Sequence, residues 1–512
     1  MNRTRLRGPG LIGLAVLAAA VSLAGRGQSG TGTAATGLVP KTWDDDALAS
    51  MDVPLAVASH SPTHVSSDYY YRIPVRKIYK QYPVYVPDKE PAGYFDALKT
   101  REPEEIRFDF DSFQTDAEWI AAGRVVFDAG VGFNQRWAGA DVRDPGLWAH
   151  ARIPTTPDGV VPFISYTIRQ RGQVEIADAG CVLCHTRLMP DGTIVRGAQG
   201  NNPADRVVAY ARRVQRDAQS DKEAFLASLR LVLARQESMP WLNPDPGERI
   251  RSMSFEDIMA AYDGHPPGVI TRRHTSLVYS SQIPDLIGLR ERRYFDHTGL
   301  VRHRSVGDLM RYAALVQGMD RFDRFGDFSL TDALPDPETL TRYSDPQLYA
   351  LARYLYSLEP PPNPHPVDDL ARTGEGVFRA QGCATCHTPP LYTNNKLTPA
   401  EGFTPALDGH TTLDVHPVSV RTDSNTALRG RKGTGYYKVP SLKGVWYRGP
   451  FEHNGSVATL EDWFDSARLE DAYVPTGFKG VGVGHRAVKG HPFGLRLSSD
   501  DKKALIAFLR TL

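Results

Sequence analysis

The chain has 512 residues, with 60 basic and 59 acidic side chains, and 41% of its residues are hydrophobic. This length is enough for about three domains of roughly 150 residues each, and the composition excludes a disordered chain and a polytopic membrane protein. The even charge balance gives no electrostatic reason to expect nucleic-acid binding.

The first residues have the pattern of an export signal. Three arginines precede an apolar run from Leu11 to Ala24, which is shorter than the stretch of about 20 residues that a membrane-spanning helix needs. We therefore predict a cleaved signal peptide over residues 1–24 and a periplasmic or secreted protein with no membrane attachment after cleavage. An uncleaved anchor is the alternative.

Two segments of different composition follow. Residues 25–66 begin with many Gly, Thr and Ala residues, which is typical of a flexible tether. Residues 67–115 are crowded with Tyr, Pro and basic side chains, a mixture that can also stack on single-stranded nucleic acid. Because export argues against nucleic acid, we expect instead an N-terminal wrapping segment with half-buried tyrosines.

All four cysteines of the chain fall in two identical patterns, Cys-x-x-Cys-His. The first comprises Cys181, Cys184 and His185, and the second comprises Cys383, Cys386 and His387. This is the attachment signature of a c-type haem: two thiols reach the two vinyl groups of the porphyrin, and the next residue offers its imidazole to the iron. The sequence therefore predicts two covalently attached haem c groups, with His185 and His387 as iron ligands.

Two other interpretations of these cysteines fit less well. A thioredoxin-like pair needs a βαβ setting and no histidine. A structural zinc site usually separates its two cysteine pairs by about 15–20 residues, whereas these motifs lie far apart in the chain.

Each motif lies between two predicted helices. The closing helices contain Leu348, Leu351 and Leu355 in the first case and the segment LSSDDKKALIAFLRTL in the second, with apolar residues at helical spacing. We place the start of the first at Asp345, as its N-cap. Glycine and proline are abundant, at 45 and 38 residues, which indicates long loops.

This pattern predicts a mainly α fold of two cytochrome c-type haem domains with long loops, preceded by the extended N-terminal segment. The first domain, of catalytic type, covers residues 116–359 and is enlarged by insertions, one of them just before its motif. A Pro-rich linker follows over residues 360–366, and the second domain covers residues 367–512.

The axial ligands decide what each haem can do, because an iron with two protein ligands transfers electrons and one with an open face can bind a small oxidant. No methionine follows Met319, so the second haem lacks a local Met ligand and a bis-His haem is expected. The candidates in its own domain are His410, His416, His453, His485 and His491.

The sixth ligand of the first haem stays open at this point. No histidine occurs between His185 and His265, although Met189 follows the motif closely. The remaining possibilities are a vacant face or one of the residues His265, His274, His297, His303, Tyr279 and Tyr294.

The segments VPSLKGVWYRGPFEHNGSVATLEDWF and LSSDDKKALIAFLRTL, together with the two haem motifs, resemble the bacterial dihaem cytochrome c peroxidases and the related dihaem enzymes that mature tryptophan tryptophylquinone. The wide motif spacing and the segment IPDLIGLRERRYFDHTGLVRHRSVGDLMRYAALVQG resemble the enlarged branch that includes the dihaem rubber oxygenases. The resemblance covers about residues 116–512.

The resemblance implies a catalytic haem in the N-terminal domain and an electron-transfer haem in the C-terminal domain. It also implies a histidine ligand near the C-terminus, in the loop GHPFG, which favours His491 over His453 as the second choice. This chain lacks the Met ligand and the early histidine of the peroxidases, so the oxidant, peroxide or dioxygen, stays open. Trp446 is one candidate for an aromatic residue between the haems, and a core Trp is the alternative.

We therefore expect a periplasmic dihaem oxidoreductase that exchanges electrons with a small redox protein. Its first haem would activate the small oxidant and its second haem would relay electrons. No catalytic side chain can be assigned from the sequence. The alternative is a dihaem electron-transfer cytochrome without catalytic activity, in which both irons are saturated by protein ligands.

Overall fold

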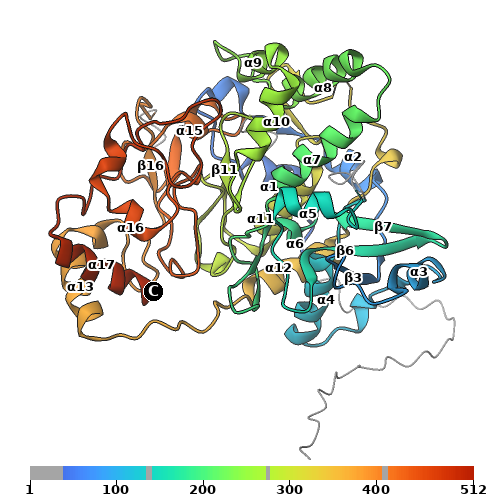
Figure 1. Ribbon diagram of the computed structural model, residues 1–512, viewed down its shortest axis with the longest axis horizontal. Coiled ribbons are helices and arrows are strands. Elements are labelled where there is room, and N and C mark those ends of the chain that lie inside the picture. The colour runs from blue at the N-terminus through green and yellow to red at the C-terminus, as the bar shows by residue number, and fades with distance from the viewer. Residues whose placement is uncertain (1–38, 134–140, 272–276, 332, 406–412) are drawn as a thin grey trace, which may run out of the picture. The chain divides into compact units, whose positions relative to one another are not determined.

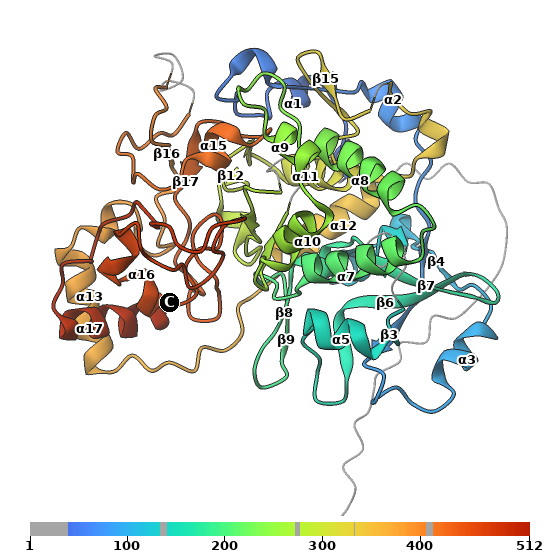
Figure 2. The same ribbon diagram turned by 45° about the horizontal axis from the view of Figure 1, so that its top comes forward.

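Two pairs of crossed helices frame the two cysteine motifs. Helix α4 (Asp116–Asp128) packs against α12 (Asp345–Tyr356), and α13 (Asp369–Ala380) packs against α17 (Ser499–Arg510). Figure 1, a computed structural model, shows α13 and α17 side by side, and Figure 2 shows the same pair from another direction. The structure describes residues 39–133, 141–271, 277–331, 333–405 and 413–512, so the predicted signal peptide lies outside the described residues.

Each helix pair crosses at a glycine. A Cβ atom on Gly123 in α4 would overlap the carbonyl oxygen of Ala350 in α12, and a Cβ on Gly374 in α13 would overlap the carbonyl oxygen of Ala504 in α17. Only glycine allows two helix backbones to approach so closely. Each motif is therefore flanked by one pair of helices that cross at a glycine, as expected for two copies of one arrangement.

The helix caps largely follow the sequence. Ser498 accepts a hydrogen bond from the Asp501 N–H and caps α17 as predicted. The N-cap of α12 is Ser344 and not Asp345: the Ser344 hydroxyl and the Gln347 side chain form a capping box, which satisfies two backbone donors at once. Asp345 instead accepts a hydrogen bond from the Tyr71 hydroxyl at 3.0 Å.

A four-stranded antiparallel sheet combines three strands of the insertion before the first motif with one strand of the N-terminal segment. Its strand order is β3 (Gln81–Tyr85), β6 (Val160–Gln170), β7 (Gln173–Asp178) and β5 (Gly132–Phe133). Strands β6 and β7 form a hairpin around Arg171 and Gly172, with Gly172 at a positive φ of 83°. Apolar side chains of this sheet pack with α5 (Pro145–Ala151) in a core of their own.

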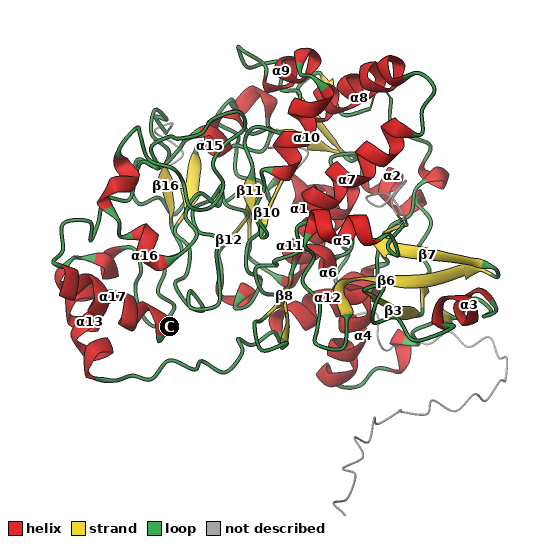
Figure 3. Ribbon diagram, in the orientation of Figure 1, coloured by secondary structure: helices red, strands yellow, loops and turns green. Residues whose placement is uncertain are grey.

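This sheet corrects the expected mainly α fold. Of the described residues, 36% are in helices and 14% in strands, so the fold mixes α and β structure, without a closed barrel in the described part of the chain. Figure 3 shows the long strands gathered on one side of the fold, whereas loops dominate around α13 and α17. The physical reason is the run VVPFISYTIRQ, whose β-branched and aromatic side chains favour a strand.

The remaining elements are helices of various lengths and short paired strands. The other helices are α6 (Cys181–Cys184), α7 (Ala204–Asp217), α8 (Lys222–Gln236), α9 (Pro246–Ser252), α10 (Phe255–Asp263), α11 (Val306–Gly318), α15 (Asn425–Arg429) and α16 (Leu460–Trp463). The other strands are paired as β8 (Thr186–Leu188) with β9 (Ile194–Arg196), β10 (Val269–Ile270) with β11 (Ser281–Gln282), β12 (Tyr294–Phe295) with β13 (Val301–Arg302), and β16 (Leu397–Pro399) with β17 (Tyr436–Lys438).

The N-terminal segment is folded onto the rest of the chain. Its elements are α1 (Asp45–Ala49), α2 (Ser67–Arg72), α3 (Tyr94–Lys99), β2 (Ile78–Tyr79), β4 (Glu105–Ile106), and β1 (Pro62–His64), which pairs with β14 (Asp323–Phe325) and through it with β15 (Phe328–Ser329). Trp43 and Met51 are fully buried in the core that contains α4 and α12. The expected flexible tether over residues 25–66 is therefore wrong for residues 39–66, because their apolar side chains belong to the core.

A buried ion cluster holds this segment in place. The His64 ring nitrogens lie 2.7 Å from Asp52 and 2.8 Å from Asp323. Lys432, from the C-terminal half of the chain, lies 3.6 Å from the same Asp323. The two carboxylates raise the pKa of His64 to about 10 against the opposing effect of burial, so the ring is charged at neutral pH.

The predicted linker, residues 360–366, contains no helix or strand. Its Asn363 amide donates to the carbonyl oxygen of Arg510 at the end of α17. None of the helices in the described part of the chain combines the length and the apolar character that crossing a membrane requires.

Candidate haem sites

The second motif begins directly after α13. Gly382 adopts a positive φ of 73° and turns the chain into a short 3₁₀ helix, Cys383–Thr385. The ring of His387 follows, and its Nδ1 lies 3.2 Å from the carbonyl oxygen of Tyr392. This hydrogen bond fixes the orientation of the imidazole and leaves Nε2 for another partner, which is how histidine ligands of metals are usually held.

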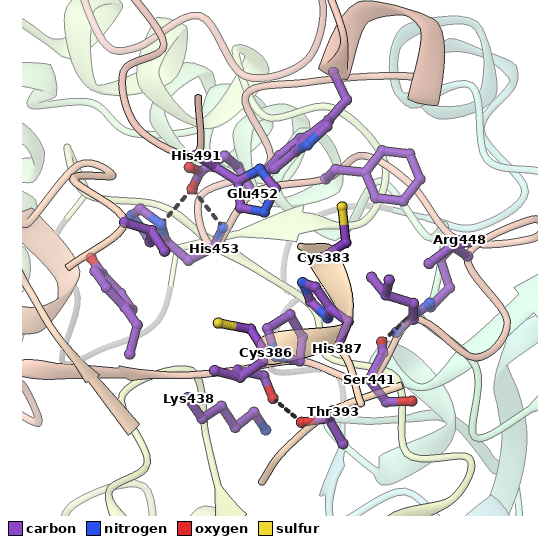
Figure 4. A pocket seen from close by; sticks show the side chains of 18 of the residues that line it. Cys383, Cys386, His387, Thr393, Lys438, Ser441, Arg448, Glu452, His453 and His491 are labelled. Carbon is purple, nitrogen blue, oxygen red and sulfur yellow. Dashed lines mark hydrogen bonds and ion pairs between the residues drawn. The ribbon is translucent and has the colours of Figure 1, made fainter. Parts of the chain in front are cut away.

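A cavity of about 330 Å³ surrounds this motif. Cys383, Cys386 and His387 all line it, and Figure 4 shows the imidazole of His387 between the two cysteine side chains. Much of the wall is apolar and comes from both helices of the crossed pair and from the loops between them, through Phe378, Val445, Phe451, Phe464, Leu505 and Leu509.

His491 lies across this cavity from His387. The centroids of the two imidazole rings are 6.3 Å apart. Two imidazoles that each bind one metal ion through nitrogen at about 2.0 Å place their ring centroids about 6.3 Å apart. The two rings therefore lie close enough together for both of them to hold one metal ion between them.

Both rings are in the form that a metal needs. Burial lowers the pKa of His387 to about 4, and burial together with the neighbouring His387 lowers the pKa of His491 to about 4. Neutral imidazoles keep a lone pair for coordination. The Nδ1 atom of His491 is buried and has no hydrogen-bond partner among the described residues, so no other described side chain competes for that nitrogen.

His453, the second choice, also lines the cavity but is held differently. Its Nδ1 lies 2.5 Å from a carboxylate oxygen of Glu452, and its Nε2 lies 3.7 Å from Asp423. Although burial opposes it, the charge of Glu452 and the bond to Asp423 raise the pKa of His453 to about 9. An imidazolium has no free lone pair, so this geometry favours His491.

The other candidates for the second iron lie elsewhere. His485 is exposed, and the His416 N–H donates to the carbonyl oxygen of Leu397 at the edge of β16. Neither lines the cavity. His410 lies outside the described residues.

One corner of the cavity carries excess positive charge. Arg292, Lys438 and Arg448 all line it. The acids among the lining residues are Asp285 and Glu452, and Glu452 already pairs with His453. Burial and the charge of Arg292 lower the pKa of Lys438 to about 7.

These features fit a haem c. The cavity offers two thiols, two opposed neutral imidazoles and a largely apolar wall, and Arg292, Lys438 and Arg448 would hold the two propionate carboxylates that every haem carries. Without carboxylates in this corner, Asp285 is the one lining acid not paired with His453 that faces the two arginines and Lys438, whose pKa is already lowered. Buried cations are costly without anionic partners.

The first motif forms the short helix α6, which starts after Gly180. The Nδ1 of His185 lies 3.0 Å from the carbonyl oxygen of Pro284, so this ring is oriented by a backbone carbonyl in the same way as His387. The thiol of Cys181 is buried, and burial raises its pKa to about 12. The two motifs thus share their local construction.

The candidates for the sixth position of the first iron are dispersed. The two ring nitrogens of His303 contact the Arg292 carbonyl oxygen and the Tyr356 hydroxyl. The ring of His265 stacks on Phe478 with centroids 4.9 Å apart. These histidines are therefore engaged in other contacts.

The remaining candidates also have partners of their own. His297 Nε2 lies 2.7 Å from the Gln282 carbonyl oxygen, and the Tyr294 hydroxyl accepts the Asp414 N–H. Met189 packs in an apolar cluster with Val195, Ala198 and Tyr447. The Tyr279 hydroxyl accepts a hydrogen bond from Arg429, and His274 lies outside the described residues.

Two consecutive residues connect the two sites. Pro284, the partner of His185, also lines the cavity around His387, and so does Asp285. The buried carboxylate of Asp285 accepts a hydrogen bond of 2.7 Å from the Tyr447 hydroxyl. Trp446 packs beside Tyr447, with ring centroids 5.2 Å apart, and contacts the same small cluster as Met189.

The sequence did not identify the residues that join the sites. Pro284 and Asp285 stand in the segment IPDLIGLRERRYFDH, which carried the resemblance but assigned them no role. Arg292, Lys438 and Arg448 read as ordinary surface charges. Lys438 and Arg448 stand among aromatic residues and glycine, where a charge is often buried, whereas Arg292 lies in a run of charged residues and carries no such signal.

Comparisons with known proteins give distant neighbours only. No protein family model matches the chain, and no curated protein matches it. The solved structures that are similar include the following three. A hydrazine synthase of Kuenenia stuttgartiensis is 16% identical with a TM-score of 0.29, covering 57% of this chain and 89% of its own.

The other two neighbours are structures of the diheme peroxidase BthA from Burkholderia thailandensis, both 18% identical. One, of a variant, has a TM-score of 0.25 and covers 56% of this chain and 86% of its own, and the other has a TM-score of 0.26 and covers 84% and 94%. All three TM-scores lie below 0.5.

Proposed function

We propose that this protein is a periplasmic oxidoreductase with two covalently attached haem c groups. One is held by Cys181, Cys184 and His185, and the other by the corresponding residues Cys383, Cys386 and His387. The observation that carries the proposal is the pair His387 and His491, whose ring centroids lie 6.3 Å apart in a cavity lined by both cysteines of the second motif.

The haems supply one-electron transfer and, at an iron with an open position, activation of peroxide or dioxygen. The residues around the second motif suit the first role. The two buried, neutral imidazoles of His387 and His491 would both hold this iron, and much of the cavity wall around them is apolar. Small oxidants therefore have no position to bind there.

The first site is the one proposed to react. His185 would hold its iron from one side, with Nδ1 fixed by the Pro284 carbonyl oxygen. On the other side, His303 and His297 are hydrogen-bonded and Met189 packs in an apolar cluster. The ring of His265 stacks on Phe478, and both of its nitrogens lack a hydrogen-bond partner among the described residues. This favours an iron that a peroxide or dioxygen molecule can reach.

Electrons would pass between the sites through the short connection at Pro284 and Asp285. Pro284 contacts His185 and lines the cavity of the second site, and Asp285 ties Tyr447 and Arg448 to the same wall. A small redox protein would supply or remove the electrons. This partner is proposed from the resemblance.

The decisive test is the spin state of each haem in the mature, oxidised protein. Electron paramagnetic resonance should show one low-spin signal that cyanide leaves unchanged and one signal that cyanide converts. Two low-spin haems that ignore cyanide in both redox states would instead support the electron-transfer cytochrome. Initial rates with hydrogen peroxide, compared with oxygen uptake on an unsaturated substrate, then separate peroxidase from oxygenase activity.

A further inference from the structure

A second cavity lies at the end of α11, away from the His387 pocket. Its volume is about 170 Å³. The wall is formed by the end of α11, the segment that precedes α12, residues just before the first motif, and two side chains of the N-terminal segment. The lining includes Tyr70, Arg76, Gln317, Arg321, Arg342 and Tyr343.

The charge of this cavity is uncompensated. Arg76, Arg321 and Arg342 line it, and no Asp or Glu is among its lining residues. Within the part of the chain that the structure describes, none of the three forms an ion pair with an acid. The nearby carboxylate of Asp345 accepts a hydrogen bond from the Tyr71 hydroxyl and does not line the cavity.

Several buried donors around the cavity also lack partners. The hydroxyl of Tyr70, a residue with no exposed surface, has no hydrogen-bond partner among the described residues. The same holds for the Nε atoms of Arg76 and Arg342. Buried donors are nearly always satisfied in folded proteins, and leaving one unsatisfied is unfavourable.

The guanidinium groups are held in place by other contacts. Arg76 donates to the carbonyl oxygens of Val131 and Thr341. Arg342 donates to the carbonyl oxygen of Tyr343 and lies over the ring of Tyr70, 5.2 Å from its centroid. These side chains are therefore positioned before any ligand arrives, which lowers the entropic cost of binding.

We propose that this cavity binds a small oxyanion of the size of phosphate, sulfate or a short carboxylate. Such an anion would be held by Arg76, Arg321 and Arg342, with the Tyr70 hydroxyl as a neutral donor. Charge-assisted hydrogen bonds from arginine are the strongest that a protein offers to these groups. The exposed residues Thr339 and Thr341 also line the cavity and give it an opening to solvent.

The site adjoins the first cysteine motif. Gln317 lines the cavity, and its amide nitrogen lies 3.9 Å from the Sγ atom of Cys181. A bound anion therefore adds a negative charge close to one thioether position of the proposed first haem. We expect anion binding to shift the absorption spectrum of that haem, whereas the second haem should not respond.

The test is isothermal titration calorimetry of the mature holoprotein with sodium phosphate, with sodium sulfate and with sodium acetate, each at constant ionic strength. Saturable binding of one anion per chain is expected. Arg321→Gln should weaken that binding by about tenfold, the usual effect of losing one hydrogen bond to a charged group. Arg324→Gln is the matched control, because Arg324 is exposed on β14 only three residues away and does not line the cavity.

The Tyr70→Phe variant tests the effect on anion binding without an expected loss of stability. The variant loses only a hydroxyl that has no partner, so its thermal stability without added anion should equal or exceed that of the wild type. Its anion affinity should fall several-fold, to an extent between those of Arg324→Gln and Arg321→Gln. An exposed, non-specific anion site would not respond to this buried hydroxyl.

Four results would overturn the proposal. Heat without saturation is one, and an equal response of both arginine variants is a second, because both mean screening by salt. Another is the absence of binding to the wild type, as when carboxylates of a covalently attached group already fill the cavity. The last is wild-type affinity in both Tyr70→Phe and Arg321→Gln. The measurement reports anion binding, so the anion site can be absent while the haem assignment is correct. Equally, the anion can bind while the haem assignment is wrong.

Comparison of phosphate and sulfate with acetate shows whether the cavity prefers a tetrahedral anion or a carboxylate.

Discussion

The imidazole Nδ1 of His185 lies 3.0 Å from the carbonyl oxygen of Pro284, a residue that also lines the cavity around His387. The residue that orients His185, the proposed first iron ligand, is thus part of the wall of the second site. Asp285 follows directly and is buried in the same wall, beside Arg448 at 3.9 Å. A substitution at Pro284 or Asp285 is therefore expected to alter the surroundings of both proposed haems.

Asp285→Asn should raise the reduction potential of the second haem. The ferric state carries one more positive charge than the ferrous state, so loss of a buried carboxylate destabilises the ferric state. We expect a rise of tens of millivolts, on the scale of about 59 mV for each factor of ten in a one-electron equilibrium. Spectroelectrochemical titration measures it, with Asp500→Asn as an exposed control on α17. Equal potentials in the variant and the wild type would place the carboxylate outside the field of the iron.

His491→Ala should convert one haem from low spin to high spin and leave the other unchanged. The reason is the loss of the imidazole that faces His387. Absorption and electron paramagnetic resonance spectra report the change, and haem content per chain controls for incorporation. His453→Gln should keep the low-spin signal, since that ring is held between Glu452 and Asp423. If His453→Gln loses the signal and His491→Ala keeps it, the assignment passes to His453.

Gly374→Ala should destabilise the protein, because the added methyl group meets the carbonyl oxygen of Ala504 where α13 crosses α17. Overpacking of this kind costs about 1–3 kcal/mol or more of unfolding free energy. Gly376→Ala lies two residues further along the same helix with no atom within 4 Å of the new Cβ, and should be neutral or stabilising by about 0.5–1 kcal/mol. Denaturant unfolding followed by circular dichroism compares the two. Similar stabilities would mean that the helices do not cross at Gly374.

The free energy of unfolding should fall as pH rises from about 6.5 to about 10. Asp52 and Asp323 raise the pKa of His64 to about 10 from 6.5 in the unfolded chain. A raised pKa means that the charged ring stabilises the fold fully below the unfolded value and loses this contribution as pH passes the folded value. Lys432 also faces Asp323, so part of the pairing persists.

The control is His64→Gln, which should show a flatter stability profile over the same pH window. At pH 6 this variant should be less stable by on the order of 3 kcal/mol, because two buried carboxylates lose their cation. Guanidinium unfolding at several pH values measures both. A wild-type slope equal to that of the variant would contradict the charged His64.

The framework of the fold follows from local patterns in the sequence. The leucines of α12 and the cap at Ser498 predicted helices that the structure contains, because helical periodicity is written into neighbouring residues. The hairpin of β6 and β7 was missed although VVPFISYTIRQ and QVEIAD flank a two-residue Arg-Gly turn, a recognisable strand signal. The sequence analysis identified an insertion here but assigned it no strands.

The candidate site was predictable only where its chemistry is local. Cys-x-x-Cys-His is contiguous, so both motifs were found, and the choice of His491 rested on a resemblance. The cation corner of Arg292, Lys438 and Arg448 combines segments that are far apart in the chain, and no local rule states that these charges are buried together. For the same reason the sequence did not show that Trp43 belongs to the core. Trp43 has no exposed surface, although its segment was predicted to be a flexible tether.

The shared wall has a consequence for dissection of the molecule. Helices α13 and α17 pack against each other within residues 367–512, so these residues could be expressed as a separate fragment. Such a fragment would keep both cysteines, His387 and His491, yet lose Asp285 and Arg292, and Lys438 would become open to water. A haem bound there would report a more solvent-exposed electrostatic environment, so potentials measured on an isolated C-terminal half would not be those of the intact chain.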